Sequence, residues 1–378
     1  MIASSLVQPR VVHDVDVAVI GAGVVGLACA ATLAARGRQV AILEKNRRIG
    51  QETTSRNSGV IHAGLYYPTG SLKARFCVEG RRLLYERCER HGIPHRRCGK
   101  ILVATDDAER KKIEGIHALG LANGAGALEL LDGAAVTRLE PRVRAVAGLL
   151  SPETGIVDAH ALCESYRREA EDHGALLGFD NHVVALEPAG GGGWRVRART
   201  SAGASDELAV RAVVNAAGLD APRLAALAGI DLAERRWQQH LCKGDYFRLS
   251  TRHAGLARHL VYPVPVQAGL GIHITFDLGG KLMAGPDTEY IDRVRYDIDA
   301  SKAARFGAAL RRYLPDVRDE DLEPDYAGIR PKLAGPGEAF RDFVVEEEAG
   351  LVNLIGIESP GLTAAGAIAR RVAELIDV

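Results

Sequence analysis

The sequence predicts an α/β protein of two domains, one Rossmann-like and one built mainly on an antiparallel sheet. The chain has 378 residues, more than one compact core usually holds. A glycine-rich turn near its start joins an apolar run to an alanine-rich helical pattern. Later segments alternate apolar and polar residues between glycine turns, which is typical of antiparallel strands.

The glycine-rich turn lies in "VDVAVIGAGVVGLACAATLAARGRQVAILEK", residues 15–45. Residues 15–20 are apolar and largely β-branched, so we expect a buried strand. Gly21, Gly23 and Gly26 then fit GxGxxG. The first glycine permits a tight turn, the second lets a pyrophosphate approach the backbone, and the third lets the next helix pack on the strand. We expect that helix over residues 24–36.

An acidic residue follows at the expected distance. The second predicted strand, 39–43, ends at Glu44, 18 residues after Gly26, where a carboxylate accepts hydrogen bonds from ribose hydroxyls. The combination favours a dinucleotide site over a glycine-rich turn in some other parallel sheet. The residues that we expect to contact the dinucleotide here are Gly21, Gly23, Val24, Val25, Gly26, Glu44 and Lys45.

The segment after Glu44 distinguishes FAD from NAD. An NAD domain would continue with another αβ unit, but residues 50–67 read "GQETTSRNSGVIHAGLYY". Small residues, hydroxyls and backbone amides suit a longer cofactor whose flavin ring lies over the chain. We therefore predict FAD, in contact with Thr53, Ser55, Arg56, Asn57, Ser58 and Gly59.

Two later segments support FAD. "AVVNAAGLDA", residues 212–221, predicts a strand that returns to the first sheet and brings Ala216, Ala217 and Gly218 to the cofactor. Residues 350–376 predict a strand, a Pro-Gly turn and an amphipathic helix that begins near Leu362. Its N-terminus, with Gly361, Leu362 and Thr363, can stabilise negative charge on the reduced flavin. The helix can equally serve to close the domain, and the two roles are compatible.

The predicted domains are interleaved along the chain. Residues 1–85, 150–230 and 340–378 are expected to form the Rossmann-like FAD-binding domain, and residues 86–149 and 231–339 the second, mainly antiparallel substrate domain. Within them we expect a helix in residues 158–175, a hairpin loop at 189–193, a hairpin turn at Gly279-Gly280 and a helix over 299–313.

Composition excludes several classes of function. Lys plus Arg and Asp plus Glu both number 48, so no basic field recruits nucleic acid. Six cysteines without a CxxC pair argue against a structural metal or a disulfide framework and fit a reducing compartment. The first fourteen residues lack a signal-peptide pattern, and no stretch reaches about 18 apolar residues. We expect no transmembrane segment and a cytoplasmic protein, with peripheral contact at the inner membrane left open.

Longer stretches resemble a known family across nearly the whole chain. They are similar to FAD-dependent oxidoreductases related to D-amino-acid oxidase, and within these to L-2-hydroxyglutarate dehydrogenases or oxidases. Relatives carry a GxHFT-like run, whereas this chain has "GIHITF", which keeps the polar positions and changes an aromatic. The stretches that carry the resemblance are "TSRNSGVIHAGLYYPTGSLKARFCVEG", "CGKILVAT", "VYPVP", "GIHITFDLGGKLMAGPD", "AGIRPKL" and "NLIGIESPGLTAAGAIA".

The resemblance implies FAD bound non-covalently and a small-molecule L-2-hydroxy dicarboxylic acid as substrate, most simply L-2-hydroxyglutarate oxidised to 2-oxoglutarate. It implies that electrons pass onward to a quinone, a dye or oxygen. Two other readings stay open. One is an oxidase or dehydrogenase of amino acids, N-methyl amino acids or glycerol 3-phosphate on the same fold. The other is a flavin-binding protein without turnover.

Oxidation of a hydroxy acid needs a base and a carboxylate-binding group. A histidine of near-neutral pKa suits the hydroxyl proton, and His62 and His273 are the candidates, with His62 ranked first. Each can instead be a satisfied histidine that never touches the proton. Arg330 precedes a proline that holds the backbone extended, which suits a bidentate carboxylate contact better than a surface role. Lys243 can bind a second carboxylate or be an ordinary exposed lysine, and Tyr262 can supply a hydroxyl or pack in the core.

Overall fold

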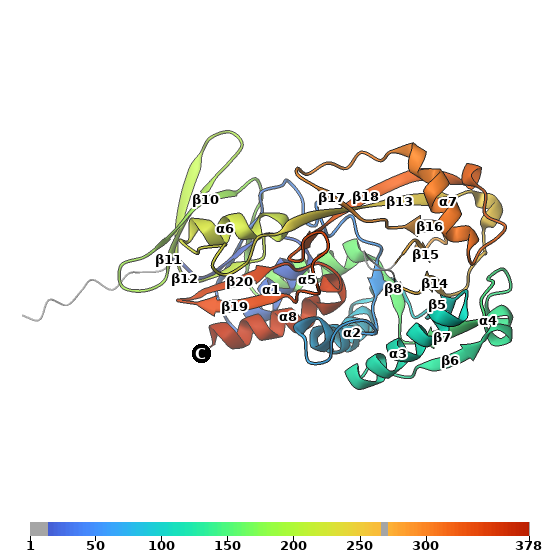
Figure 1. Cartoon of the computed structure of the whole chain (residues 1–378). Helices are drawn as coiled ribbons and strands as arrows, with labels where there is room; N and C mark the ends of the chain where they lie inside the picture. Colours follow the sequence, from blue (N-terminus) through green and yellow to red (C-terminus); the bar gives the residue numbers. More distant parts are fainter. Residues whose placement is uncertain (1–13, 266–270, 378) are drawn as a thin grey trace, which may run out of the picture.

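The computed structural model describes residues 14–265 and 271–377. It confirms the mixed α/β class, with an eight-stranded first sheet, a nine-stranded second sheet and a small third sheet. Figure 1 shows β10–β12 of the first sheet at one end of the molecule and β13–β18 with α7 at the other. Residues 1–13, where the signal-peptide prediction falls, lie outside the described residues.

The first sheet follows the expected Rossmann pattern. Strand β1 pairs in parallel with β2 on one side and β12 on the other, and β20 pairs in parallel with β12. β10, β11 and the first part of β12 form an antiparallel meander joined by the predicted loop at 189–193. Its strands are β1 (Val15–Ile20), β2 (Val40–Leu43), β9 (Leu176–Gly178), β10 (His182–Pro188), β11 (Trp194–Arg199), β12 (Ser205–Asn215), β19 (Val344–Glu348) and β20 (Leu351–Ile355).

Helices cover the first sheet because their apolar faces complete its core. The predicted C-terminal helix packs between the glycine-turn helix and α2, and Leu162, Tyr166 and Ala170 of α5 are buried in the same cluster, as the periodicity predicts. Figure 1 shows α8 beside α1 and α2. The helices are α1 (Val24–Ala35), α2 (Leu72–His91), α5 (Ala159–Asp172), α6 (Ala221–Leu227) and α8 (Gly361–Ile376).

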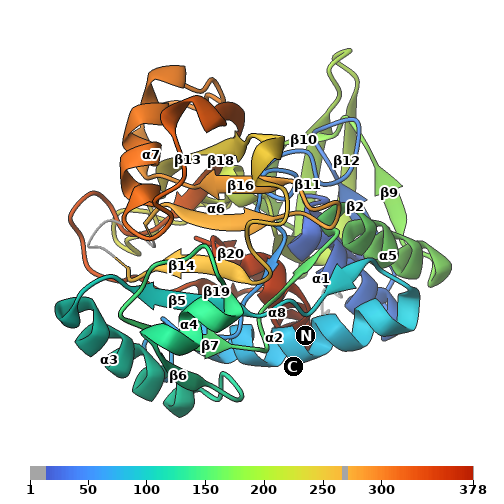
Figure 2. The same cartoon turned by 90° about the vertical axis from the view of Figure 1, so that its right-hand side faces the viewer.

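The second sheet is mainly antiparallel, and its long central pair is β13 with β18. Its strands are β5 (Lys100–Ala104), β6 (Glu129–Asp132), β7 (Ala147–Ser151), β13 (His240–Leu249), β14 (Leu260–Pro263), β15 (His273–Phe276), β16 (Leu282–Gly285), β17 (Glu289–Ile291) and β18 (Leu322–Lys332). The helices α3 (Asp107–Asn123), α4 (Gly133–Leu139) and α7 (Ala303–Arg311) flank it (Figure 2). The single-turn segments η3 (Ala300–Lys302), which precedes α7, and η4 (Asp319–Asp321), which precedes β18, adjoin this region.

Several shorter elements lie outside the two large sheets. β3 (Val60–Ile61), β8 (Gly155–Val157) and β4 (His95–Arg96) form the third sheet, and a one-turn helix η1 (Gly218–Asp220) follows β12. A second such turn, η2 (Thr251–His253), follows β13. The predicted turn at Gly279-Gly280 joins β15 to β16. The helix predicted over 299–313 is shorter, because residues 300–302 form a separate 3₁₀ turn before α7.

The chain segments that supply each sheet can be compared with the predicted domain division. Segments 15–43, 176–215 and 344–355 supply the first sheet, and segments 100–151 and 240–332 supply the second. The chain thus crosses between the sheets several times, and the domain boundaries themselves stay a prediction. In the described part of the chain, no helix is long and apolar enough to span a bilayer.

Candidate active site

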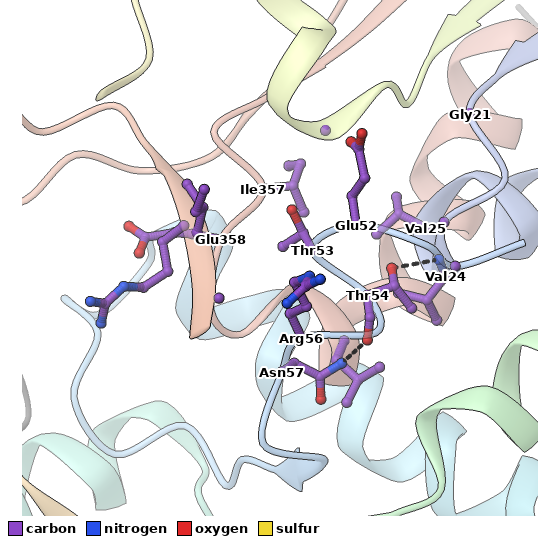
Figure 3. A pocket seen from close by; sticks show the side chains of 18 of the residues that line it. Gly21, Val24, Val25, Glu52, Thr53, Thr54, Arg56, Asn57, Ile357 and Glu358 are labelled. Atoms are coloured by element: carbon purple, nitrogen blue, oxygen red, sulfur yellow. Dashed lines mark hydrogen bonds between the residues drawn. The ribbon is translucent and has the colours of Figure 1, made fainter. Parts of the chain in front are cut away.

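One cavity is lined by residues from both sheets, and it collects most of the predicted site residues. Figure 3 shows part of it from close by. The predicted residues that line it are Gly21, Gly23, Val24, Val25, Glu44, Lys45, Thr53, Arg56, Asn57, Ser58, His62, Ala216, Ala217, Gly218, Tyr262, His273, Arg330, Gly361 and Leu362. Five predicted residues are not in the lining: Gly26, Ser55, Gly59, Lys243 and Thr363.

The glycine turn between β1 and α1 forms one end of the cavity, and its geometry requires glycine. Gly21 has a φ of +105°, and a Cβ there would come within 2.6 Å of the Ala216 carbonyl oxygen. A Cβ on Gly26 would lie 2.0 Å from the Gly21 carbonyl oxygen. Gly26 therefore acts by letting α1 approach β1, which explains why it does not line the cavity itself.

Glu44 is held at the tip of β2. One carboxylate oxygen accepts from the Ala22 backbone N–H at 2.7 Å, and the other accepts from the Asn46 backbone N–H at 2.8 Å. These bonds fix the carboxylate beside the glycine turn, where a ribose would reach it. The neighbouring Lys45 already pairs with Asp220 at 2.7 Å and Glu52 at 2.8 Å, so its charge is compensated within the chain.

The loop after Glu44 runs along the cavity, as Figure 3 shows for Glu52 to Asn57. The Thr54 hydroxyl accepts from the Val24 N–H at 3.2 Å, which ties the loop to the first turn of α1. The Thr53 hydroxyl is buried in the cavity wall without a hydrogen-bond partner in the described structure. Ser55 instead points to solvent and bonds to the Gln51 carbonyl at 2.9 Å, so the prediction that it contacts the cofactor is not supported by its placement.

The start of α8 reaches the cavity through Gly361 and Leu362. Thr363 is turned into the protein. Its hydroxyl accepts from the His62 backbone N–H at 3.0 Å and donates to the Val60 carbonyl at 3.3 Å. Thr363 therefore joins α8 to β3 and places His62. Gly59 also serves the backbone, because a Cβ at its φ of +64° would meet the Val157 carbonyl oxygen at 2.8 Å.

Both candidate histidines face the cavity. The His62 Nε2 lies 3.3 Å from the Ser359 hydroxyl, and the His273 Nδ1 lies 3.1 Å from the Gly271 carbonyl. A carbonyl only accepts, so His273 carries its proton on Nδ1 and its Nε2 is free to accept. Removal from solvent lowers the pKa of each imidazole to about 3, and the nearby Lys100 cation adds to both shifts. Both rings are therefore neutral, as a proton acceptor must be.

Tyr262 lies under His273. The two rings stack with centroids 3.7 Å apart and planes 13° apart, which fixes the imidazole plane. Tyr262 and the neighbouring Tyr246 both line the cavity, so either hydroxyl can face a ligand.

Arg330 lies on β18 and lines the cavity. Its guanidinium donates to three backbone carbonyls: Cys242 at 3.4 Å, Lys243 at 3.3 Å and Asp287 at 2.8 Å. No carboxylate pairs with it anywhere in residues 14–265 and 271–377. A guanidinium withdrawn from water without an anion is costly, whereas an incoming carboxylate accepts from it bidentately.

Lys243 is displaced from its expected role. It lies on β13 with its side chain buried, and its Nζ pairs with Asp245 at 2.6 Å. Gly244, the next residue, lines the cavity instead. Successive side chains on a strand point to opposite faces, so Lys243 points away from any ligand. This placement does not support the prediction that Lys243 binds a second carboxylate.

The sequence reasoning missed several residues that line the cavity. Ser359 and Glu358 precede the Pro-Gly turn into α8, and the only signal for them was that position. Glu358 pairs with the buried Lys73 at 2.8 Å, which anchors this turn to α2. Figure 3 shows Ile357 next to Thr53 of the loop that carries Arg56.

Comparison with known proteins identifies the family. A family model described as FAD dependent oxidoreductase matches residues 16–375. The chain belongs to the FAD-dependent oxidoreductase family. A relative from Arabidopsis thaliana named as mitochondrial L-2-hydroxyglutarate dehydrogenase is 41% identical over 95% of this chain and 83% of its own length. Another from Salmonella houtenae, named L-2-hydroxyglutarate dehydrogenase, is 29% identical over 93% of this chain and 90% of its own length.

A solved structure of a family-like enzyme gives the same fold. Dithionite-reduced L-α-glycerophosphate oxidase from Mycoplasma pneumoniae, with FAD bound, superposes with a TM-score of 0.87 at 26% identity. The match covers 96% of this chain and 95% of that one. Glycine oxidase from Geobacillus kaustophilus, with a TM-score of 0.79 at 24% identity over 97% and 95% of the two chains, shares the fold.

The cavity fits the FAD that the family binds. Gly21 and Gly23 line the cavity where a pyrophosphate must approach, and Glu44 lies where a ribose would. The Thr53 hydroxyl has no partner within the described residues and faces the same space, so a ligand atom can satisfy it. The first turns of α1 and α8 both reach the cavity, which suits a cofactor with negative groups at two places.

Proposed function

We propose that this chain oxidises an L-2-hydroxy dicarboxylic acid, first of all L-2-hydroxyglutarate, to the 2-oxo acid. One observation carries the proposal: the Arg330 guanidinium faces the cavity, donates only to backbone carbonyls and has no carboxylate partner in the described chain. It is therefore suited to a substrate carboxylate. The relatives named L-2-hydroxyglutarate dehydrogenase, which match most of the chain, support this choice of acid.

The chain's own groups divide the work as follows. Arg330 binds the carboxylate next to the reacting carbon and orients the substrate. His62 takes the hydroxyl proton, because it ends the 57–62 segment and faces the Ser359 turn, both of which border the cofactor space. His273, held by Tyr262, accepts a hydrogen bond through Nε2 and aligns the hydroxyl. Bound FAD would supply the acceptor for the hydride that leaves C2.

We expect substrate binding to favour this proton transfer, because burial alone opposes it. Burial keeps both imidazoles neutral, since it lowers their pKa values to about 3. An anionic substrate beside them favours the protonated form and raises the pKa of the facing imidazole toward the working pH. The histidine is thus a competent base where the carboxylate is bound.

The acceptor and compartment are further parts of the proposal. We expect electrons to leave for a quinone, a dye or oxygen, and we expect a cytoplasmic protein. All six cysteines are free, which fits a reducing compartment. The name of the plant relative places that protein in mitochondria. A quinone acceptor would require peripheral contact with the inner membrane. Reoxidation of the reduced protein by oxygen, compared with a soluble quinone, decides between these acceptors.

Anaerobic mixing tests the substrate. The yellow absorbance of the purified holoprotein should bleach with L-2-hydroxyglutarate and persist with the D enantiomer. When Arg330 holds the carboxylate, we expect only the L enantiomer to direct its C2 hydrogen toward the cofactor. Glycerol 3-phosphate and glycine serve as matched controls for the rival substrates. Bleaching by glycerol 3-phosphate or glycine but not by L-2-hydroxyglutarate would refute the proposal.

A further inference from the structure

The three carbonyls that hold Arg330 lead to a group of buried charges behind it. They belong to Cys242, Lys243 and Asp287. The side chains of Lys243 and Asp287 lie among ion pairs and are removed from solvent. The backbone that orients the cavity arginine is therefore continuous with a polar cluster outside the cavity, which we call the rear ion cluster: Lys243, Asp245, Asp287, Glu289 and Lys302.

Lys302 is the centre of the rear ion cluster. It comes from the 3₁₀ turn η3 before α7, outside the sheet, and its Nζ lies 2.5 Å from Asp245, 3.1 Å from Asp287 and 2.7 Å from Glu289. Asp245 also pairs with Lys243 at 2.6 Å, and both of these side chains are buried. In this cluster Lys302 is the cation shared by all three carboxylates.

The cluster joins two segments that carry the arginine's acceptors. The Asp245 backbone N–H donates to the Asp287 carboxylate at 2.8 Å, so β13 is tied to the 285–289 segment. Lys302 contacts both of these aspartates and fixes their separation. The wall between cluster and cavity is thin, since a Cβ on Gly244 would meet Pro286 Cβ at 2.6 Å and Arg330 Nη2 at 3.2 Å. A shift of Asp287 would therefore move a carbonyl that lies 2.8 Å from Nη2.

We propose that Lys302 is a positioning residue for substrate binding, which acts through Asp245 and Asp287 to fix the direction of the Arg330 guanidinium. The inference rests on the proposed function, in which Arg330 receives a carboxylate. Lys302 is not among the residues that line the cavity. Its removal leaves Asp245 paired with Lys243 alone and Asp287 paired with Arg305 alone. The two buried carboxylates then lose the cation that they share, and their positions relative to each other are no longer fixed.

Binding of 2-oxoglutarate to the oxidised holoenzyme, measured by calorimetry, tests the proposal. Lys302→Met should weaken the Kd by about tenfold, since an ångström-scale misplacement of a substrate-binding group has effects of this order or more. KM for L-2-hydroxyglutarate should rise with it, while kcat at saturation changes less than threefold. Lys281→Met is the matched control: Lys281 forms an exposed ion pair with Asp325 on the same sheet, and its loss should leave the Kd unchanged.

A double-mutant cycle separates positioning from general damage. In an Arg330→Lys background the guanidinium that donates to the three carbonyls is gone. Lys302→Met should then weaken 2-oxoglutarate binding by less than a further twofold. Equal losses in both backgrounds, or no loss in the wild-type background, would overturn the inference. If Lys302→Met does not fold, Lys302→Arg should still weaken the Kd about threefold, and an unchanged Kd refutes the inference equally. Absence of 2-oxoglutarate binding by the wild type would instead remove the proposed function, and this inference with it.

Discussion

The two ends of the cavity are built in different ways. The dinucleotide end comes from one contiguous unit, β1, the glycine turn, α1 and β2, whose fit is decided by contacts such as Gly26 to Gly21. The substrate end has no such unit. His62, Tyr262, His273 and Arg330 come from β3 and its following loop, β14, β15 and β18, and meet only when the sheets pair.

The difference explains which properties tolerate change. At the dinucleotide end the backbone itself makes the site, so a single added methyl group can abolish it. At the substrate end side chains make the site, so substitutions can alter substrate or rate while the fold and the cofactor are kept. Three experiments separate these cases.

The largest effect is expected for Gly26→Ala at the dinucleotide end. The new Cβ would lie 2.0 Å from the Gly21 carbonyl oxygen, so α1 must move off β1 at a cost of about 3 kcal/mol or more. The purified protein should contain little FAD and unfold at a lower temperature. Gly115→Ala in α3 is the control, because its Cβ meets nothing within 4 Å, and it should be neutral or stabilising. A variant that keeps full flavin content would contradict the comparison.

The same difference sets what the sequence could predict. The glycine turn, Glu44 and the Pro-Gly entry to α8 were predicted with their neighbours, because local spacing fixes their geometry. His273 and Arg330 were found as residue types suited to the chemistry, and the structure brings both to the cavity. Their meeting with His62 depends on sheet pairing, which local pattern does not encode.

Lys243 shows why some predicted site residues do not line the cavity. β13 is buried on both faces over residues 242–247, so its sequence shows no alternation that would tell which side chains face the cavity. If the residues that face the cavity are misassigned by one position, Lys243 is predicted to line the cavity in place of Gly244. Ser55 and Thr363 lie outside the cavity lining for a related reason, since a hydroxyl in a loop or first helical turn bonds its own chain as readily as a ligand.

The intermediate effect concerns the two histidines. His62→Ala should lower kcat on L-2-hydroxyglutarate by about 10²–10⁴-fold, the usual contribution of a general base, with flavin content unchanged. His273→Ala removes only an aligning contact and should cost less in kcat than in KM. Stopped-flow flavin reduction measures both. If His62→Ala keeps its kcat within threefold while His273→Ala loses it, the assignment of the two roles is reversed.

The smallest effect tests a charge behind the substrate end. Lys100 on β5 is buried, with its Nζ 4.6 Å from the Tyr66 ring centroid and 4.8 Å from that of Tyr262, and no ion pair is present within the described residues. Burial lowers the pKa of Lys100 to about 7 from 10.5. The unfolded chain therefore binds the extra proton between these pH values, and stability should rise with pH across that window.

Lys100→Met removes the free-energy cost of burying this charge in the folded state. Below pH 7 both states of the wild type carry the charge and its full burial cost, so the variant should melt about 4 °C higher at pH 6. Near pH 10 the folded wild type is already neutral, and the gain should shrink toward zero. Lys281→Met, at an exposed pair, should show no such trend. An equal gain at both pH values would mean that packing rather than charge controls the site, since the methionine side chain is uncharged at every pH.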